Sequence, residues 1–359
     1  MWSRTLAALA AASAAVVAAA SIVVAASTPS PAVDSLAVDA AHRFLEQYVE
    51  PDGRVVRRDQ GNDTVSEGQA YGMLLAVGVG NEDTFRSIWT WTTRHLQRPD
   101  GLLSWRWADG AIADANSAAD ADLDAARALV LGGERFDDAA LTAAGVRLGQ
   151  AILDGETVST PRGRILTAGS WTAEGAAPWM VNPSYASPVA AELLHAASGD
   201  ARWVDLAAGD RSALSTLVVA GTTPPDWATV DASGHAVAAP APGSPAVASS
   251  YDAARVSARY AESCDPRDQR LAASLTDVLQ SADRFHAVAW VAVAAAQAAA
   301  GDDDDTAQES LHRAVRLDAE QPTYYGAAWI ALGAIMLTDT GLGGCPPMSG
   351  ASVDGLNDG

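Results

Sequence analysis

A succession of apolar segments with a period near 3.6 residues is the feature that most restricts how this chain can fold. Each segment is rich in Ala, Leu and Val and has the spacing of a helix that buries one face. Most segments are joined by short connections, so neighbours in the sequence are expected to pack as antiparallel pairs. The twelve segments cover approximately 35–49, 64–79, 82–97, 117–133, 137–154, 185–198, 201–219, 252–263, 267–280, 283–299, 306–317 and 322–338. The pattern therefore predicts an all-α fold of six helical hairpins.

Two connections are too long to be simple turns. Residues 98–116 and 220–250 are rich in Gly, Pro, Asp and Trp. Strand signals are few, and the best of them is RILTAGSW at 164–171. Long ordered loops in a compact domain are where binding and catalytic residues concentrate. We therefore expect the two long connections to lie beside a functional site.

The charge of the chain excludes several classes of function. Its 359 residues carry a formal net charge of -21, and all 23 basic residues are arginine. A surface this acidic repels a phosphate backbone, which excludes nucleic acid as a partner. Because the sequence contains no lysine, Schiff-base chemistry is excluded as well.

Residues 1–34 have the pattern of an export segment. Arg4 precedes an apolar run of about 22 residues that ends in small side chains, which is typical of a secretory signal. The run is long enough that an uncleaved membrane anchor is the alternative. Both interpretations place the rest of the chain outside the cytoplasm, where Cys264 and Cys345 can form a disulfide. Two unpaired thiols are the other reading of these cysteines.

The stretch SEGQAYGM at 66–73 begins a predicted helix, and its Glu67 has two interpretations. With the preceding TV it matches a capping box, in which the carboxylate serves only the helix end. Gly68 and Gly72, however, each destabilise a helix interior by about 1 kcal/mol relative to Ala. Glycine at these two positions indicates that another backbone or a ligand approaches this face of the helix closely. Tyr71 lies on the same side of the helix, so an acid, a bare surface and an aromatic ring occur together.

A second acidic cluster, SAADADLD at 117–124, lies where the first long connection meets a helix. Asp120 and Asp124 share one helix face, whereas Asp122 points about 200° away. Capping needs one or two carboxylates, and three in so short a stretch raise one another's pKa. The run leads into an apolar helix and not into a glycine turn, which argues against a calcium site. We expect neither a metal nor another cofactor.

A third candidate, YDAAR at 251–255, begins the helix after the second long connection. Asp252 and Arg255 are either a surface ion pair worth a few tenths of a kcal/mol or a carboxylate held ionised and oriented by an arginine. NPSY at 182–185 forms a turn into another helix, downstream of Trp171. Acidic residues thus recur at the starts of helices that follow Trp-bearing loops. In a toroid of helical hairpins they gather at one end.

Two carboxyl groups with aromatic neighbours suit glycoside hydrolysis, in which one group protonates the leaving oxygen and the other activates water. At these residues the sequence also resembles glycoside hydrolase family 8. SEGQAYGM is similar to the general-acid motif of that family, and SAADADLD to its aspartate signature. The motifs NPSY, PDW at 225–227, YDAAR and TYYGAAWIALG at 323–333 follow in the family's order.

The resemblance covers about residues 36–340 and implies an (α/α)6 barrel, in agreement with the twelve predicted helices. The sequence departs from the family pattern at Ala119, where Ser or Thr is preferred. It departs again after YDAAR, where the family commonly continues toward Pro-Trp-Arg. Neither departure removes a group proposed to transfer a proton.

The resemblance implies that Glu67 is the general acid and Asp252 the general base of an inverting mechanism. It also implies that Asp120 binds the sugar at the point of cleavage and that Tyr185 places the attacking water. The other residues expected to bind substrate are Arg255, Trp105, Trp171, Trp227, Tyr325, Tyr71 and Asp122.

These observations predict an exported endo-β-1,4-glucanase of the cellulase type, acting as a monomer on a β-linked polysaccharide. β-1,4-Xylanase and chitosanase are the alternatives with the same chemistry. A glycan-binding scaffold without catalysis is the alternative from another class, and the presence of both Glu67 and Asp252 argues against it. The expected organisation is an export signal or membrane anchor with a linker at 1–34, a catalytic barrel at 35–340 and a flexible tail at 341–359.

Overall fold

The computed structural model describes residues 35–348 except for 219–221, 282–285 and 302–303. Each of the twelve predicted segments contains a helix, so the prediction of an all-α fold is confirmed. The segment predicted at 267–280 is divided into two helices. The helices are α1 (Ser35–Tyr48), α2 (Ser66–Gly78), α3 (Glu82–His95), α4 (Ala119–Arg135), α5 (Ala139–Gly155), α6 (Ser170–Ala173), α7 (Pro188–Ser198), α8 (Arg202–Leu217), α9 (Tyr251–Ala261), α10 (Pro266–Ala273), α11 (Thr276–Ser281), α12 (Ala287–Ala300), α13 (Asp304–Glu320) and α14 (Tyr324–Thr338).

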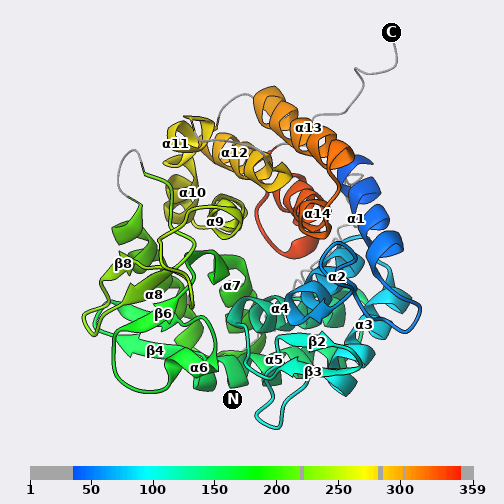
Figure 1. The fold of residues 1–359 in the computed structure, drawn as a ribbon, viewed down its shortest axis with the longest axis horizontal. Coiled ribbons are helices and arrows are strands. Elements are labelled where there is room, and N and C mark those ends of the chain that lie inside the picture. The colour runs from blue at the N-terminus through cyan, green and yellow to red at the C-terminus, as the bar shows by residue number, and fades with distance from the viewer. Residues whose placement is uncertain (1–34, 219–221, 282–285, 302–303, 349–359) are drawn as a thin grey trace, which may run out of the picture. The chain divides into compact units, whose positions relative to one another are not determined.

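Six of these helices form a closed inner ring, which Figure 1 shows from one end. In the order α2, α4, α7, α9, α12 and α14, each contacts the next, and α14 contacts α2. The helices between them in sequence pack outside the ring. A helix that is apolar all round belongs in a core, and α12 and α14 are buried on nearly every side. The outer α13 buries only one face. The arrangement is the (α/α)6 barrel that was expected.

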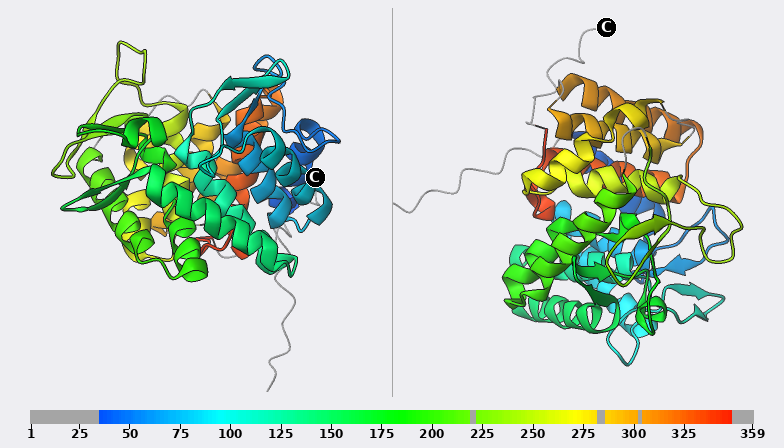
Figure 2. Two further views of the ribbon diagram at one scale, coloured as in Figure 1. Left: turned by 90° about the horizontal axis from the view of Figure 1, so that it is seen from below. Right: turned by 90° about the vertical axis from the view of Figure 1, so that its left-hand side faces the viewer.

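The two long connections are ordered as small sheets. In the first, β2 (Arg106–Ala108) and β3 (Ala111–Asp114) form a hairpin, and β2 also pairs with β1 (Thr64–Val65) directly before α2. In the second, β7 (Ala228–Val230) and β8 (Ala236–Ala238) form a hairpin beside β6 (Trp179–Val181). The β2–β3 hairpin and the loop after β8 project from one end of the barrel (Figure 2).

The predicted strand at 164–171 is strand only in its first part. The hairpin of β4 (Thr157–Thr160) and β5 (Gly163–Leu166) ends at Leu166, and α6 follows within the predicted range.

The glycines of α2 make room for neighbouring side chains. A Cβ on Gly68 would lie 2.5 Å from the hydroxyl oxygen of Tyr324, and a Cβ on Gly72 would lie 2.9 Å from Cδ1 of Ile88. Close approach to this face was expected from another backbone or from a ligand. Packing against α14 and α3 is instead the reason for both glycines.

The segment that follows α14 is fastened to the barrel. Cys264 and Cys345 form a disulfide, and the Cys345 N–H donates to the carbonyl of Glu262 at 2.8 Å. Met348 is buried as well. The flexible tail expected from 341 therefore does not begin there, because its first eight residues, 341–348, are held by covalent and backbone bonds and by burial.

The remainder of that tail and the expected export or anchor segment at 1–34 lie outside the described residues. Within the part of the chain that is described, no helix combines the length and the hydropathy needed to span a membrane.

Candidate active site

Glu67 lies in the first turn of α2, but the helix end is not built as a capping box. The residue at the cap position is Val65, and no side chain caps the helix there. The hydroxyl of Thr64 donates instead to the carbonyl of Val55 at 2.8 Å. The carboxyl group of Glu67 turns toward the centre of the barrel, so the capping interpretation does not hold.

One oxygen of Glu67 is saturated by protein donors. Its Oε1 accepts from the Tyr71 hydroxyl at 2.6 Å and from Arg255 Nη1 at 2.7 Å. The Tyr71 oxygen itself accepts from Trp329 Nε1 at 3.1 Å, which directs the Tyr71 proton toward Glu67. Among the described residues no donor reaches Oε2, and the side chain is 20% exposed. A proton on this carboxyl group therefore belongs on Oε2.

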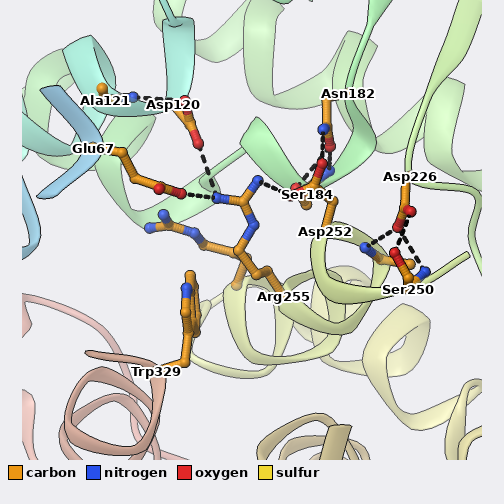
Figure 3. A network of polar contacts seen from close by, with 12 residues as sticks. Glu67, Asp120, Ala121, Asn182, Ser184, Asp226, Ser250, Asp252, Arg255 and Trp329 are labelled. Atoms are coloured by element: carbon orange, nitrogen blue, oxygen red, sulfur yellow. Dashed lines mark hydrogen bonds and ion pairs between the residues drawn. The ribbon is translucent and has the colours of Figure 1, made fainter. Parts of the chain in front are cut away.

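Arg255 joins the three acidic residues singled out from the sequence (Figure 3). Its Nη1 donates to Glu67 and to Asp120 at 2.9 Å, and its Nη2 donates to Asp252 at 3.0 Å. The arginine side chain is only 1% exposed, so these ion pairs are poorly screened by water. The sequence pairs Arg255 only with Asp252, whereas the fold adds carboxylates from α2 and α4.

Both oxygens of Asp252 are held. Oδ1 accepts from Arg255, and Oδ2 accepts from Asn182 Nδ2 at 2.7 Å. The Asp252 side chain is 30% exposed, so the group keeps contact with solvent. The carboxylate is thus oriented from two sides and still accessible to a water molecule.

Asp120 is the buried member of the cluster. Burial raises the pKa of its carboxyl to about 7, and the nearby Glu67 and Asp124 act in the same direction while Arg255 opposes them. The group is therefore largely protonated in mildly acid solution. In that state it can donate a hydrogen bond as well as accept one.

These groups open into a cavity of about 330 Å³. Seven of the residues predicted to form the site line it, namely Glu67, Trp105, Asp120, Tyr185, Asp252, Arg255 and Tyr325. The cavity is also lined by residues that the sequence did not single out, including Arg57, Asp59, Gln60 and Tyr251.

Four residues predicted to bind substrate do not line this cavity. Tyr71 is fully buried and contacts Glu67 instead of open space. Asp122 is also fully buried and accepts the N–H of Leu103, because it lies on the side of α4 away from Asp120. Trp171 and Trp227 lie outside the lining, although the Trp227 ring contacts Tyr185 at 6.2 Å between centroids.

Sequence reasoning missed Asn182 and Asp226. They lie in the motifs NPSY and PDW, in which only the aromatic residues, Tyr185 and Trp227, were predicted to belong to the site. The Asn-Pro step was a usable signal for Asn182, since such steps begin turns and fix the side chain. Nothing in the sequence indicated that Asp226 contacts the start of a helix more than twenty residues later.

Three buried arginine–carboxylate pairs, the first of them within the site, cross the barrel between α4 and α9. Arg255 pairs with Asp120, Arg259 with Asp124, and Glu262 with Arg127, and the separation in sequence is 135 residues in every pair. The third pair also reaches the C-terminal segment, because Arg127 donates to the Leu342 carbonyl. We call these pairs the arginine ladder.

Asp122 and Glu156 form a second buried acidic group behind Asp120. Burial raises the pKa of Glu156 to about 7 from its usual 4.5, and burial raises the pKa of Asp122 well above its usual value. Such groups keep protons in the folded state that the unfolded chain releases. The free energy of unfolding therefore falls as pH rises from about 4.5 to about 7.

We expect the melting temperature to be a few degrees lower at pH 7.5 than at pH 5. Differential scanning calorimetry of the wild type and of Glu156→Gln measures the melting temperature at both pH values. The melting temperature of the variant should fall less between them, because the glutamine amide does not titrate. Identical declines in both proteins would show that Glu156 is not among the groups responsible.

Known proteins resemble this chain in sequence and in fold. A family model described as Glycosyl hydrolases family 8 matches residues 9–327. A probable endoglucanase from Novacetimonas hansenii is 43% identical over 110 residues, which are 30% of this chain and 32% of that protein. The chain spans between 32% and 53% of the length of the first curated relatives that it matches.

Two solved structures share the fold. The endo-β-1,4-glucanase from Acetobacter xylinum has a TM-score of 0.68 at 25% identity, with 84% of this chain and 97% of that chain covered. A reducing end xylose-releasing exo-oligoxylanase has a TM-score of 0.67 at 20% identity, with 85% and 92% covered.

Proposed function

The chain belongs to glycosyl hydrolase family 8, and from this premise we propose that it cleaves internal β-1,4 bonds of cellulose-like glucan with inversion at the anomeric carbon. One observation carries the proposal. Glu67 and Asp252 line the same cavity and are bound by different nitrogens of the buried Arg255. An acid and a base that flank one glycosidic bond are what this hydrolysis needs.

Each carboxyl group has one task in the reaction. Glu67 gives the proton on Oε2 to the glycosidic oxygen as the bond from that oxygen to the anomeric carbon breaks. Asp252 takes a proton from a water molecule whose oxygen attacks the opposite face of the anomeric carbon. The products are two shorter sugars, and the enzyme returns to its starting state when Asp252 passes its proton to solvent and Glu67 regains one.

Other residues that line the cavity bind the sugar. Trp105, Tyr185 and Tyr325 offer aromatic surfaces to the apolar faces of pyranose rings. Asp120, protonated below a pKa of about 7, hydrogen-bonds a sugar hydroxyl beside the cleaved bond. The Arg255 guanidinium lies 5.3 Å from the centre of the Tyr185 ring, which fixes that ring against the catalytic groups.

The experiment is proton NMR of fresh hydrolysis products, recorded before mutarotation, with carboxymethyl-cellulose, xylan and chitosan supplied separately. We expect turnover of the cellulose derivative and first appearance of the α-anomer, because inversion of a β-bond gives α. Initial β-anomer contradicts the inverting mechanism. Turnover of xylan alone or of chitosan alone shows that this polymer, and not cellulose-like glucan, is the substrate. Binding without turnover of any polymer favours the glycan-binding scaffold.

Export is part of the same proposal. The Cys264–Cys345 disulfide supports it, because such bonds persist outside the reducing cytoplasm. Mass spectrometry of the extracytoplasmic protein distinguishes a cleaved signal, which leaves an N-terminus near residue 27, from an intact anchor. Sedimentation of the same material tests the expectation of a monomer.

A further inference from the structure

We infer that Asn182 and Asp226 are positioning residues that hold Asp252 in place, one by its carboxylate and the other by its helix. The inference rests on the proposed function, since it concerns the base of that reaction. Neither residue lines the cavity, and both are nearly buried, at 3% and 7% exposed. They approach the first turn of α9 from two different segments (Figure 3).

Asn182 is itself locked before it reaches Asp252. Its Oδ1 accepts from the N–H of Ser184 at 3.1 Å and from the Ser184 hydroxyl at 2.7 Å. These two bonds identify which end of the amide is oxygen, so its nitrogen must face Asp252 Oδ2. A donor fixed in this way holds the Asp252 carboxylate in one orientation.

Asp226 holds the backbone that carries Asp252. Its Oδ1 accepts from the N–H groups of Ser250 and Ala253 at 2.8 and 2.9 Å, and its Oδ2 accepts from the Ser250 hydroxyl at 2.6 Å. The helix leaves these N–H groups without partners of its own, and a negative charge at this end is favoured. Asp226 thereby fixes the backbone on both sides of Asp252, at Ser250 and at Ala253.

The other ionisable groups around Asp252 do not replace these contacts. Arg255 is the cation at Oδ1, and Glu67 and Asp120 share that guanidinium. Burial raises the pKa of Tyr185 and of Tyr325 well above the usual value, so both are neutral in ordinary buffers. Burial lowers the pKa of His286, the group that faces Asp226. Asn182 is thus the donor at Oδ2 among the described residues.

The first test is Asn182→Asp, a change of one atom that keeps the acceptor for Ser184. A carboxylate then faces Asp252 Oδ2 in place of the amide N–H. We expect kcat to fall roughly 10- to 100-fold and the acidic limb of the pH–rate profile to move upward by about one pH unit. KM should change little, because Asn182 does not touch the cavity.

The second test compares Asp226→Ala with Asp226→Asn. Alanine removes all three bonds to the start of α9, so kcat should fall by about tenfold or more. Asparagine keeps an acceptor for both N–H groups and should restore most of the activity. Asp231→Ala is the matched control, because this exposed residue makes similar bonds to Ser233 and His235 on the same connection, away from the site.

Circular dichroism establishes that each variant is folded, and Asp252→Asn is assayed beside them. An unmoved acidic limb in Asn182→Asp, or equal kcat in the alanine and asparagine variants of Asp226, overturns the inference while Asp252→Asn stays inactive. Wild-type activity in Asp252→Asn instead shows that the proposed function has failed.

Discussion

Replacement of Glu67 by Gln, or of Asp252 by Asn, is expected to lower kcat on carboxymethyl-cellulose by about 10³-fold or more. Both changes keep the size of the side chain. The first removes the proton that the leaving oxygen needs, and the second removes the acceptor for the proton of water. Release of reducing ends measures kcat, and calorimetric titration with cello-oligosaccharides measures binding, which should survive in both variants.

Glu82→Gln is the matched control for Glu67→Gln. Glu82 also lies in the first turn of a helix, α3, but it is exposed and pairs with Arg86. Its replacement should leave kcat unchanged. If the two glutamine variants behave alike, Glu67 serves no catalytic role and the scaffold alternative gains support. Loss of oligosaccharide binding in Glu67→Gln would show that the residue acts on affinity and not on proton transfer.

Replacement of Arg255 by Met should abolish activity and lower the free energy of unfolding by about 3–5 kcal/mol at pH 7, the range for breaking a buried ion pair. The change leaves Glu67, Asp120 and Asp252 close together without their shared cation. Protonation relieves their repulsion, so the destabilisation should be smaller at pH 4.5 than at pH 7. Urea unfolding at the two pH values measures both quantities.

Arg86→Met provides the comparison for Arg255→Met. Arg86 also bridges two carboxylates, Glu82 and Asp138, but its side chain is 42% exposed. Exposed pairs of this kind contribute little, so its urea midpoint should stay near that of the wild type. Equal destabilisation in the two methionine variants, or a loss in Arg255→Met that does not depend on pH, would contradict the view that Arg255 neutralises a buried acidic cluster.

The helices could be predicted because each carries its own signal. Apolar periodicity is local, and all twelve segments contain helices within a few residues of the expected ends. The strands of the long connections gave no comparable signal, since two to four residues are too few to show alternation. β2 pairs with β3 inside the connection and also with Thr64 and Val65 outside it, and this second partner is not visible in the sequence between 98 and 116.

The site could be predicted only in part for a similar reason. Helical spacing separates Asp120 from Asp122 in direction, but it cannot say which side faces a cavity. Asp122, which was expected to bind substrate, is buried and does not line the cavity. Tyr71 was placed correctly beside Glu67 on α2, yet its burial depends on Trp329 from α14. The three-way role of Arg255 likewise arises from helices far apart in the sequence.

The arginine ladder has a consequence for how the active end can vary. Because the same offset of 135 residues recurs in all three pairs, α4 and α9 cannot slide along the barrel axis relative to each other without breaking every pair at once. The axial register of these two helices is therefore set deep in the core, and the Cys264–Cys345 disulfide ties the end of α9 to the C-terminal segment that Arg127 also contacts. The exposed turn of the β2–β3 hairpin, at Asp109 and Gly110, takes part in none of these pairs. Its length can therefore change while Asp120 keeps its height beside Glu67 and Asp252.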